Sequence, residues 1–408
     1  MSLSKFKLTL LAALCCGAML PSSGQTAAKE QETKLIAVLN STADFNAKSD
    51  ACRELAPIGT AAAVPALAAL LADEKLAHMA RYGLEPISDP AVDVALREAL
   101  GKLKGHLQVG VIGSIGVRRD AQAVGALVGL LKDSDAEVQQ AAARALGMLA
   151  TAEAVTGLEA ALAGAPPANQ LALCEGLFRC AEARVAEGHA APAIVIYDKL
   201  RALPHAPHQV LAGAWRGAIL ERRQAGLPLL LEALRSSHPE LMTAGLRIAL
   251  EMEGAEVSMA LADELGKVPP ARQIQLSSVL GRRGDAAALP ALITLAEAGD
   301  PTARVAAIKA ATELGNAAAV TPLIGLLGDP DAGVAQAAAT GLAGLPGAEV
   351  DAIVIGTLAS PDQAKRLKML ELVRQRRIAA AMPAPLKLMD DQNPAVRAAA
   401  VTSYAELA

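Results

Sequence analysis

Aromatic residues are scarce in this chain of 408 residues, which contains one Trp, three Tyr and three Phe. So few aromatic rings argue against surfaces on which nucleic-acid bases or sugars stack. Hydrophobic residues nevertheless make up 53% of the chain, and most of them are Ala, Leu and Val. Because Ala and Leu are strong helix formers, this composition predicts an all-α fold.

The chain also lacks an excess of positive charge, since 38 Lys and Arg residues stand against 42 Asp and Glu residues. A protein that binds a nucleic-acid duplex needs many more basic than acidic groups. We therefore predict no nucleic-acid partner. Beyond residue 24 no apolar run is long enough to cross a bilayer, so no membrane span is predicted there.

The first 24 residues, in contrast, have the pattern of an export signal. Lys5 and Lys7 form a basic head, residues 8–20 are an apolar stretch of signal-peptide length, and small residues precede Gln25. We predict cleavage after residue 24 and a mature chain that is exported, to the periplasm or outside the cell. Retention at the envelope by a lipid or an uncleaved signal is the alternative.

Cysteine is sparse as well, with five residues in all. Cys15 and Cys16 fall in the N-terminal apolar stretch and are the residues that would carry a lipid anchor. The other three, Cys52, Cys174 and Cys180, are too few and odd in number to form a disulfide framework. The sequence predicts that they are small, buried, apolar side chains.

Motifs of reactive sites are lacking too. The sequence contains no His-Glu dipeptide, Gly-x-Ser-x-Gly elbow, Gly-Lys-Ser/Thr phosphate loop or Cys-x-x-Cys pair. His205 and His208 lie close together in the sequence, but a metal site needs three or four convergent ligands, and only His189 is a candidate to join them. We predict no catalytic residue, no bound metal and no cofactor.

What the sequence does contain is an internal repeat. The stretches AVPALAALLAD (63–73), AVGALVGLLKD (123–133) and AVTPLIGLLGD (319–329) share one pattern. In each stretch apolar residues are spaced i, i+3, i+6 and i+7, which places them on one face of a helix about three turns long. We call this predicted element helix A.

A second predicted element, helix B, follows the Asp that ends helix A. DSDAEVQQAAARALGML (133–149) and DPDAGVAQAAATGLAGL (329–345) share an Asp in the turn, a Val that opens the apolar face, and small residues. An Asp there can accept hydrogen bonds from the free N–H groups of the incoming helix. Glycine is expected to end several copies. These predicted helix stops are Gly116, Gly147, Gly281 and Gly315.

The repeat has a period of about 31 residues, which is in the range that helical repeat proteins use. Val334 follows Val305 by nearly one such period, and Val396 follows Val334 by two. The period predicts one continuous domain of about twelve helix pairs over residues 33–408, after a short polar lead-in at 25–32.

The stretch HLQVGVIGSIGVRRD (106–120) resembles a phosphate-binding turn at first sight. Its glycines, however, have the spacing Gly-x-x-Gly-x-x-Gly, whereas a dinucleotide fingerprint has Gly-x-Gly-x-x-Gly after a strand. Shifted by one period, the stretch aligns with the helix B of residues 137–150. We therefore predict a degenerate helix B there.

Helix pairs with A-V-x-x-L-x-x-L-L-x-D followed by D-x-x-V-x-x-A-A-x-A-L-G resemble the short HEAT-like repeats first associated with phycobilisome lyases, a variety common in bacterial exported proteins. The likeness covers nearly all of residues 33–407 and is specific for fold rather than for function. It implies an α-solenoid, a right-handed superhelix of stacked helix pairs in which the B helices line the inner face.

Four pairs of adjacent arginines lie near the predicted ends of B helices. A cation at a helix C-terminus stabilises the helix dipole, which is the simplest explanation for them. Alternatively, pairs at equivalent positions of a stack would form a basic ridge along one edge that binds anionic groups of a partner. The pairs are Arg118 and Arg119, Arg222 and Arg223, Arg282 and Arg283, and Arg376 and Arg377.

The function that these observations favour is a non-enzymatic exported scaffold or adaptor that binds a protein partner along the groove or edge of the solenoid. Two alternatives stay open. One is an accessory, lyase-like or chaperone-like, for attachment of a cofactor or chromophore. The other is a structural component of the cell envelope that self-associates end to end, because the sequence ends in the apolar helix flank of YAELA.

Overall fold

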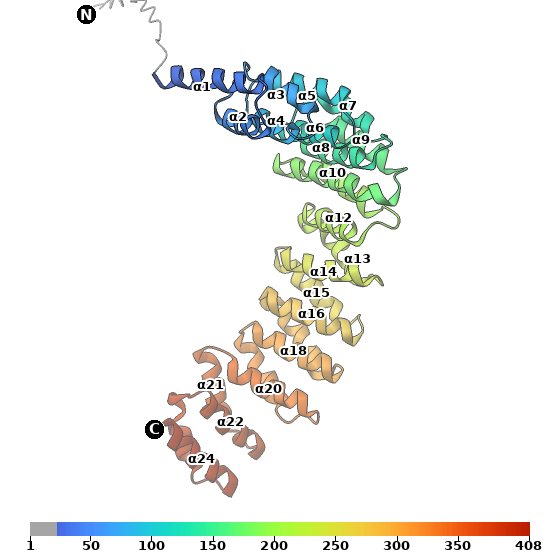
Figure 1. Cartoon of the computed structure of the whole chain (residues 1–408). Coiled ribbons are helices and arrows are strands. Elements are labelled where there is room, and N and C mark those ends of the chain that lie inside the picture. Colours follow the sequence, from blue (N-terminus) through green and yellow to red (C-terminus); the bar gives the residue numbers. More distant parts are fainter. Residues whose placement is uncertain (1–22) are drawn as a thin grey trace, which may run out of the picture. The chain divides into compact units, whose positions relative to one another are not determined.

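The structure is a computed structural model that describes residues 23–408 (Figure 1). In this part of the chain all regular structure is helical: 24 α-helices and short 3-10 turns. The predicted all-α fold is confirmed, and the helices form twelve consecutive pairs. The export signal predicted for residues 1–24 lies, except for its last two residues, outside the described residues.

The chain divides into two compact units, Met1–Ala183 and Arg184–Ala408, which are described separately. The described part of the first unit contains five helix pairs, the last of which ends beyond the boundary. Its helices are α1 (Ser23–Leu39), α2 (Phe45–Ile58), α3 (Val64–Ala69), η1 (Leu70–Ala72), α4 (Ala77–Leu84), α5 (Pro90–Lys102), α6 (Gly105–Arg118), η2 (Ala121–Ala123), α7 (Val124–Leu130), α8 (Ala136–Leu149), α9 (Ala152–Leu162) and α10 (Pro167–Ala186).

The second unit contains seven helix pairs. Its helices are α11 (Ala190–Arg201), α12 (His208–Leu220), η3 (Arg223–Gly226), α13 (Leu227–Arg235), α14 (Pro239–Glu251), α15 (Ala255–Leu265), α16 (Pro270–Arg283), η4 (Ala286–Ala288), α17 (Leu289–Ala298), α18 (Pro301–Glu313), η5 (Ala317–Ala319), α19 (Val320–Leu326), α20 (Ala332–Gly344), α21 (Ala348–Thr357), α22 (Gln363–Gln375), η6 (Ala379–Ala381), α23 (Pro383–Leu388) and α24 (Pro394–Leu407).

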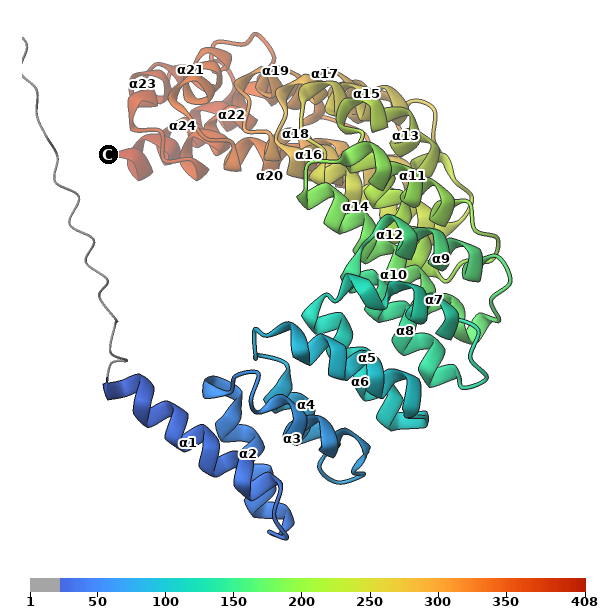
Figure 2. The same ribbon diagram turned by 90° about the horizontal axis from the view of Figure 1, so that it is seen from above.

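Each unit is an α-solenoid with two layers of helices. In the second unit the odd-numbered helices, which are the A helices, form one row, and the even-numbered B helices form the other (Figure 2). Successive B helices pack against each other, as α14 does on α16 and α16 on α18. In the first unit α2, α4, α6 and α8 pack in the same way. The stretch 106–120 is the B helix α6 and the turn after it, as predicted.

The predicted capping of B helices by acidic residues is confirmed. The Oδ1 of Asp135 accepts a hydrogen bond of 2.9 Å from the N–H of Glu137 at the start of α8. Asp300 and Asp331 do the same for α18 and α20, at 3.0 Å each. These bonds satisfy N–H groups that have no partner inside the helix, so they fix where each B helix begins.

Residues 25–32, predicted as a polar lead-in, lie inside α1. The end of this segment is packed rather than free, because Glu32 is only 4% exposed. Its Oε1 accepts hydrogen bonds from the N–H and hydroxyl of Thr60, at 2.6 and 2.8 Å. A buried carboxylate with two donors joins α1 to the turn after α2.

Three of the four predicted glycine stops are wrong. Gly116, Gly147 and Gly281 lie inside α6, α8 and α16, which continue for two residues beyond each of them. The residues that adopt the left-handed conformation after these helices are Arg119, Ala150 and Gly284. Gly315, with φ of 64° after α18, is the stop that was predicted correctly.

The misassigned glycines allow B helices to approach each other closely. A Cβ atom added to Gly147 would lie 2.7 Å from the Cα of Gly176 on α10, and one added to Gly116 would lie 3.2 Å from the Cα of Ala145 on α8. Gly281 would meet the Cα of Ala310 at 3.0 Å. The contact of 2.7 Å is closer than real Cβ atoms come to backbone, so Gly147 excludes a side chain. At Gly116 and Gly281 an added Cβ would require the neighbouring helix to shift by a few tenths of an ångström.

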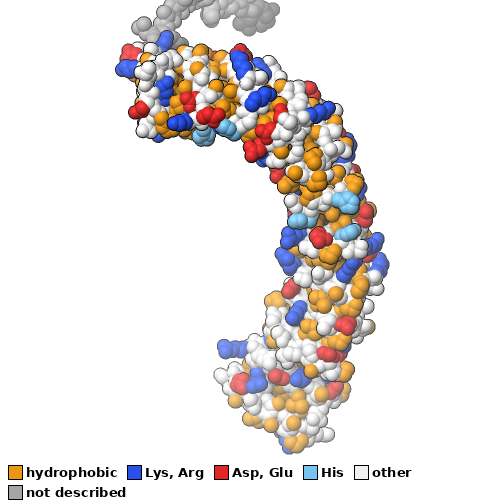
Figure 3. Space-filling view, turned by 45° about the vertical axis from the view of Figure 1, so that its right-hand side comes forward, with side chains coloured by type: hydrophobic (Ala, Val, Ile, Leu, Met, Phe, Trp, Pro, Cys, Tyr) orange, Lys and Arg blue, Asp and Glu red, His pale blue; other side chains and the backbone are white. Residues whose placement is uncertain are grey.

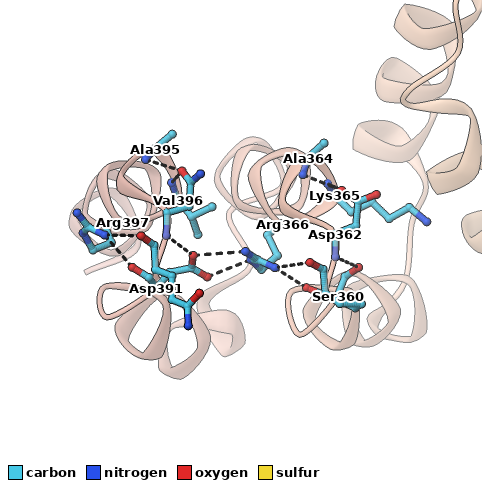
Figure 4. A network of polar contacts seen from close by, with 12 residues as sticks. Ser360, Asp362, Ala364, Lys365, Arg366, Asp391, Ala395, Val396 and Arg397 are labelled. Carbon is cyan, nitrogen blue, oxygen red and sulfur yellow. Dashed lines mark hydrogen bonds and ion pairs between the residues drawn. The ribbon is translucent and has the colours of Figure 1, made fainter.

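The turns between A and B helices are joined from one pair to the next (Figure 4). Arg366 at the start of α22 donates to the carbonyl of Ser360, at 2.8 Å, and forms an ion pair with Asp391 of the following turn, at 3.1 Å. Both side chains are nearly buried. Arg304 and Asp329 form the same kind of ion pair at an earlier position in the stack.

Close packing at Gly147 predicts opposite effects for two Gly→Ala changes in neighbouring helices. Gly147→Ala should destabilise the fold by about 1–3 kcal/mol, because the added methyl group overpacks a backbone contact. Gly113→Ala in α6 should stabilise it by up to about 1 kcal/mol, because alanine favours the helix and the added Cβ would meet no atom within 4 Å. Urea unfolding followed by circular dichroism measures the stability of both variants. Equal changes in the free energy of unfolding would contradict the close approach of α8 and α10 at Gly147.

Candidate functional site

The four arginine pairs lie at the C-terminal ends of B helices, as predicted, but the two members of each pair have different environments. One member is half-buried in the stack and the other is exposed. The half-buried members are Arg118, Arg222, Arg283 and Arg376, and the exposed members are Arg119, Arg223, Arg282 and Arg377.

Three half-buried arginines make the same contact at the same distance along the sequence. The Nη1 atoms of Arg118, Arg283 and Arg376 each donate to the carbonyl that lies one repeat period earlier. That carbonyl belongs to Ile87 (2.6 Å), Met252 (2.6 Å) and Leu345 (2.5 Å), respectively. In each case the carbonyl lies just after the preceding B helix, where helical carbonyls have no partner.

The same guanidinium groups also bind the A helix of their own pair. The Nε atoms of Arg118, Arg283 and Arg376 donate to side chains that again share one spacing along the sequence. The acceptors are Asp93 on α5 (2.5 Å), Ser258 on α15 (2.9 Å) and Asp351 on α21 (2.9 Å). One side chain therefore connects the preceding B helix with the A and B helices of its own pair.

Arg222 departs from this register. Its Nη2 forms an ion pair of 2.5 Å with Asp198 on α11, and its Nη1 donates to the carbonyl of Ala218 in its own helix, α12. It still connects an A helix with its B helix. All four half-buried arginines are thus held by the fold, and only the four exposed members are free to form the basic ridge that the sequence suggested.

The hollows of the surface lie elsewhere, along the middle of the B helices. In the first unit a groove of about 440 Å³ runs across α4, α6, α8 and α10. Its basic groups are His78 and Arg81 on α4, Arg144 on α8 and Arg179 on α10. Tyr82 and Val117, which are 50% and 54% exposed, add apolar surface to it.

Two glycines of α6, Gly110 and Gly113, form part of the wall of this groove. The guanidinium group of Arg81 lies over Gly110, so closely that a Cβ atom there would overlap it. Gly113, in contrast, faces open space, since an added Cβ would meet nothing within 4 Å. Glu85 in the wall accepts a hydrogen bond of 2.7 Å from the hydroxyl of Ser114.

Burial affects the electrostatics of this groove. It lowers the pKa of Arg81 from its usual value, because a half-buried guanidinium loses hydration, and the charge of Glu85 offsets part of that change. Arg81 nevertheless remains protonated at any physiological pH. Among the described residues the guanidinium group of Arg81 forms neither an ion pair nor a hydrogen bond.

The second unit has a comparable groove of about 550 Å³ between α12 and α14. Its floor contains Ala212, Ala244 and Ile248. Arg216 in its wall is already paired, through three hydrogen bonds, with Glu251 across the groove, and this contact raises the pKa of Arg216. The face in view in Figure 3 mixes basic, acidic and hydrophobic side chains rather than presenting one block of charge.

No group of three or more His, Cys, Asp or Glu side chains fit to hold a metal occurs within residues 23–408. Cys52, Cys174 and Cys180 are buried and form no disulfide, as predicted, and burial raises the pKa of Cys52 and Cys174 to about 11. Over the same residues, no helix has the length and apolar character needed to span a membrane.

Comparison with known proteins agrees with this architecture. The model of the HEAT-repeat family matches residues 94–177 and 258–343, one stretch in each unit. These two stretches therefore contain HEAT repeats, and the chain has an α-solenoid fold. No curated protein matches it in sequence.

Solved structures with a similar fold include three of Kap121p. The structure of Kap121p itself has a TM-score of 0.52 and 13% identity, over 93% of this chain and 49% of that one. Kap121p bound to Nup53p gives 0.53 and 13%, over 93% and 49%. The karyopherin Kap121p bound to the extreme C-terminus of the phosphatase Cdc14p gives 0.52 and 13%, over 95% and 49%. This chain spans about half the length of those structures.

Sequence reasoning missed the residues of both grooves. Arg81 and Tyr82 belong to no repeated motif, and Gly113 was considered only as a degenerate repeat position. A signal for the structural arginines did exist, because Asp93 precedes Arg118 by the same interval that separates Asp351 from Arg376. Interpreting each pair of arginines as one unit concealed that spacing.

The different environments of the paired arginines predict different effects on stability. Arg283→Ala should lower the free energy of unfolding by at least about 2 kcal/mol, because hydrogen bonds to a charged group contribute about 1.5–3 kcal/mol each. Arg282→Ala should change it by less than about 0.5 kcal/mol, because Arg282 is exposed. If urea unfolding shows the same loss of stability for Arg283→Ala and Arg282→Ala, the hydrogen bonds of Arg283 do not add to the stability of the fold.

Proposed function

We propose that this protein is a non-enzymatic scaffold or adaptor that binds a protein partner along the face formed by the B helices. The observation that carries the proposal is the position of the two grooves. Both lie on successive B helices, and their exposed side chains, such as Tyr82, Thr243 and Arg247, are not needed to hold the repeats together. A surface built from stacked repeats suits an extended partner.

The comparison with Kap121p supports this proposal in a limited way. Kap121p, which shares the fold, has been solved with Nup53p bound. At 13% identity the likeness concerns the fold alone, so the partner of the present protein has to be found by experiment. The resemblance to phycobilisome-lyase repeats likewise suggests a family relationship without indicating a chromophore or a cofactor.

Photo-crosslinking in the native cell tests where the partner binds. A benzoylphenylalanine placed at Tyr82 or Thr243 lies in the two grooves, whereas the same residue at Val94 on α5 or Met259 on α15 lies on the exposed part of an A helix. We expect the same protein to be crosslinked from Tyr82 and Thr243 and not from the A-helix positions.

Crosslinks from Val94 and Met259 alone would refute binding along the B helices. The basic ridge is distinguished in the same experiment by a probe at Arg282, an exposed arginine at the end of α16. A partner that crosslinks there, and not from the grooves, would bind the edge of the stack. Mass spectrometry of the crosslinked peptides identifies the partner segment in each case.

We also propose that the protein is exported, on the strength of residues 1–24 alone. The test is the mass of the protein recovered from the cell envelope or the medium. We expect a chain that begins at Gln25, and replacing Leu11 and Leu14 of the apolar stretch by charged residues should retain the full-length protein inside the cell. A full-length chain in the cytosol of cells with the unaltered sequence would contradict the proposal.

Self-association stays a prediction. Leu386 on α23 and Val401 on α24 are each 53% exposed, so each offers an apolar side chain for contact with a second copy. The alternative of a structural envelope component rests on this association, and analytical ultracentrifugation over a range of concentrations measures it.

A further inference from the structure

The groove of the first unit has space that the protein itself does not need. Gly113 lies in the middle of α6, where glycine disfavours the helix by up to about 1 kcal/mol relative to alanine. At the close contacts between B helices such a glycine is required by packing, but a Cβ at Gly113 would meet nothing within 4 Å. The missing side chain therefore widens the groove without improving the fold.

The groove also holds a cation without a direct partner. Arg81 is half-buried and lies over the backbone of Gly110, so its guanidinium group is positioned by the absence of a side chain there. No ion pair or hydrogen bond from the described residues compensates this guanidinium group for its loss of hydration. A guanidinium group in this state binds a carboxylate well, because its planar donors match both oxygens.

Two further side chains of the groove carry the same positive charge as Arg81. Arg144 and Arg179, which are exposed, lie on α8 and α10 along the same wall. Glu85 is the single acidic residue of the lining, and its Oε1 is engaged by Ser114. The groove is thus locally basic although the chain as a whole has a net charge of −4.

We propose that this groove binds an extended acidic segment of a partner protein, with a carboxylate placed on the guanidinium group of Arg81. The inference rests on the proposed function and names the chemistry of its partner. Separate carboxylates fit arginines that come from three different helices, and Tyr82 and Val117 offer apolar contacts between them. A dense anionic polymer fits less well, because the net negative charge of the protein repels it.

Fluorescence anisotropy with the full chain tests the proposal. The probe is a fluorescein-labelled peptide in which glutamates alternate with leucines, and the control peptide has glutamine at each glutamate. We expect the glutamate peptide to bind at least tenfold more tightly, with an affinity that falls as salt is added. Arg81→Gln should weaken its binding about tenfold or more.

Two variants separate binding in the groove from general attraction. Arg119→Gln removes an exposed arginine outside the lining and should leave the affinity unchanged. Gly113→Leu fills the groove at a position where the added Cβ has room, so the fold should persist while the peptide is excluded. Circular dichroism confirms that each variant is folded.

Three results would overturn the proposal: equal binding of the two peptides, equal effects of Arg81→Gln and Arg119→Gln, or Arg81-dependent binding of heparin without binding of the glutamate peptide. The last result would assign the groove to an anionic polysaccharide. Crosslinking from Thr243 distinguishes these failures from failure of the proposed function, because a partner captured there shows that the B helices bind protein in another groove.

Discussion

The carbonyl groups at the end of every helix have no partner inside that helix, and the 24 helices of residues 23–408 must satisfy them repeatedly. In this protein Arg118, Arg283 and Arg376 solve the problem at the ends of B helices. Each binds a carbonyl one repeat period earlier and a side chain on the A helix of its own pair. One arginine side chain is thus long enough to contact the equivalent position of the preceding repeat, 31 residues earlier in the sequence. At the opposite end of the pairs, Arg366 and Asp391 provide a comparable connection.

This constraint determines which surfaces remain for binding. Arginines and aspartates at the ends of the helices are engaged by the stack, and small residues such as Gly147 are engaged by the close approach of B helices. Residues in the middle of the exposed face of each B helix neither connect the repeats nor lie at the close contacts between B helices. Side chains there, such as Arg81 and Tyr82, can therefore vary without loss of the fold, and it is on this face that both grooves lie. The proposed binding function therefore falls on positions that the repeat does not need for packing.

The helices, their pairing and their acidic caps could be predicted from the sequence because they depend on local patterns with a period. The spacing of Val64, Leu67, Leu70 and Leu71 defines a helix face wherever it occurs. Gly147 could not be assigned in this way, because a glycine that ends a helix and one that admits a neighbouring helix are identical in sequence. The groove was beyond prediction for a related reason: Arg81 meets Gly110 only after α4 and α6 have packed side by side.

The central claim is that one arginine of each pair joins neighbouring helices, and a double-mutant cycle between Asp351 and Arg376 tests it most directly. Unfolding in urea is measured for Asp351→Asn, Arg376→Gln and the double variant, with Arg377→Gln in place of Arg376→Gln as the matched control. We predict a coupling free energy above about 1 kcal/mol between Asp351 and Arg376, as is typical of residues in contact, and none between Asp351 and Arg377. Equal coupling in the two cycles, or none in either, would contradict the account.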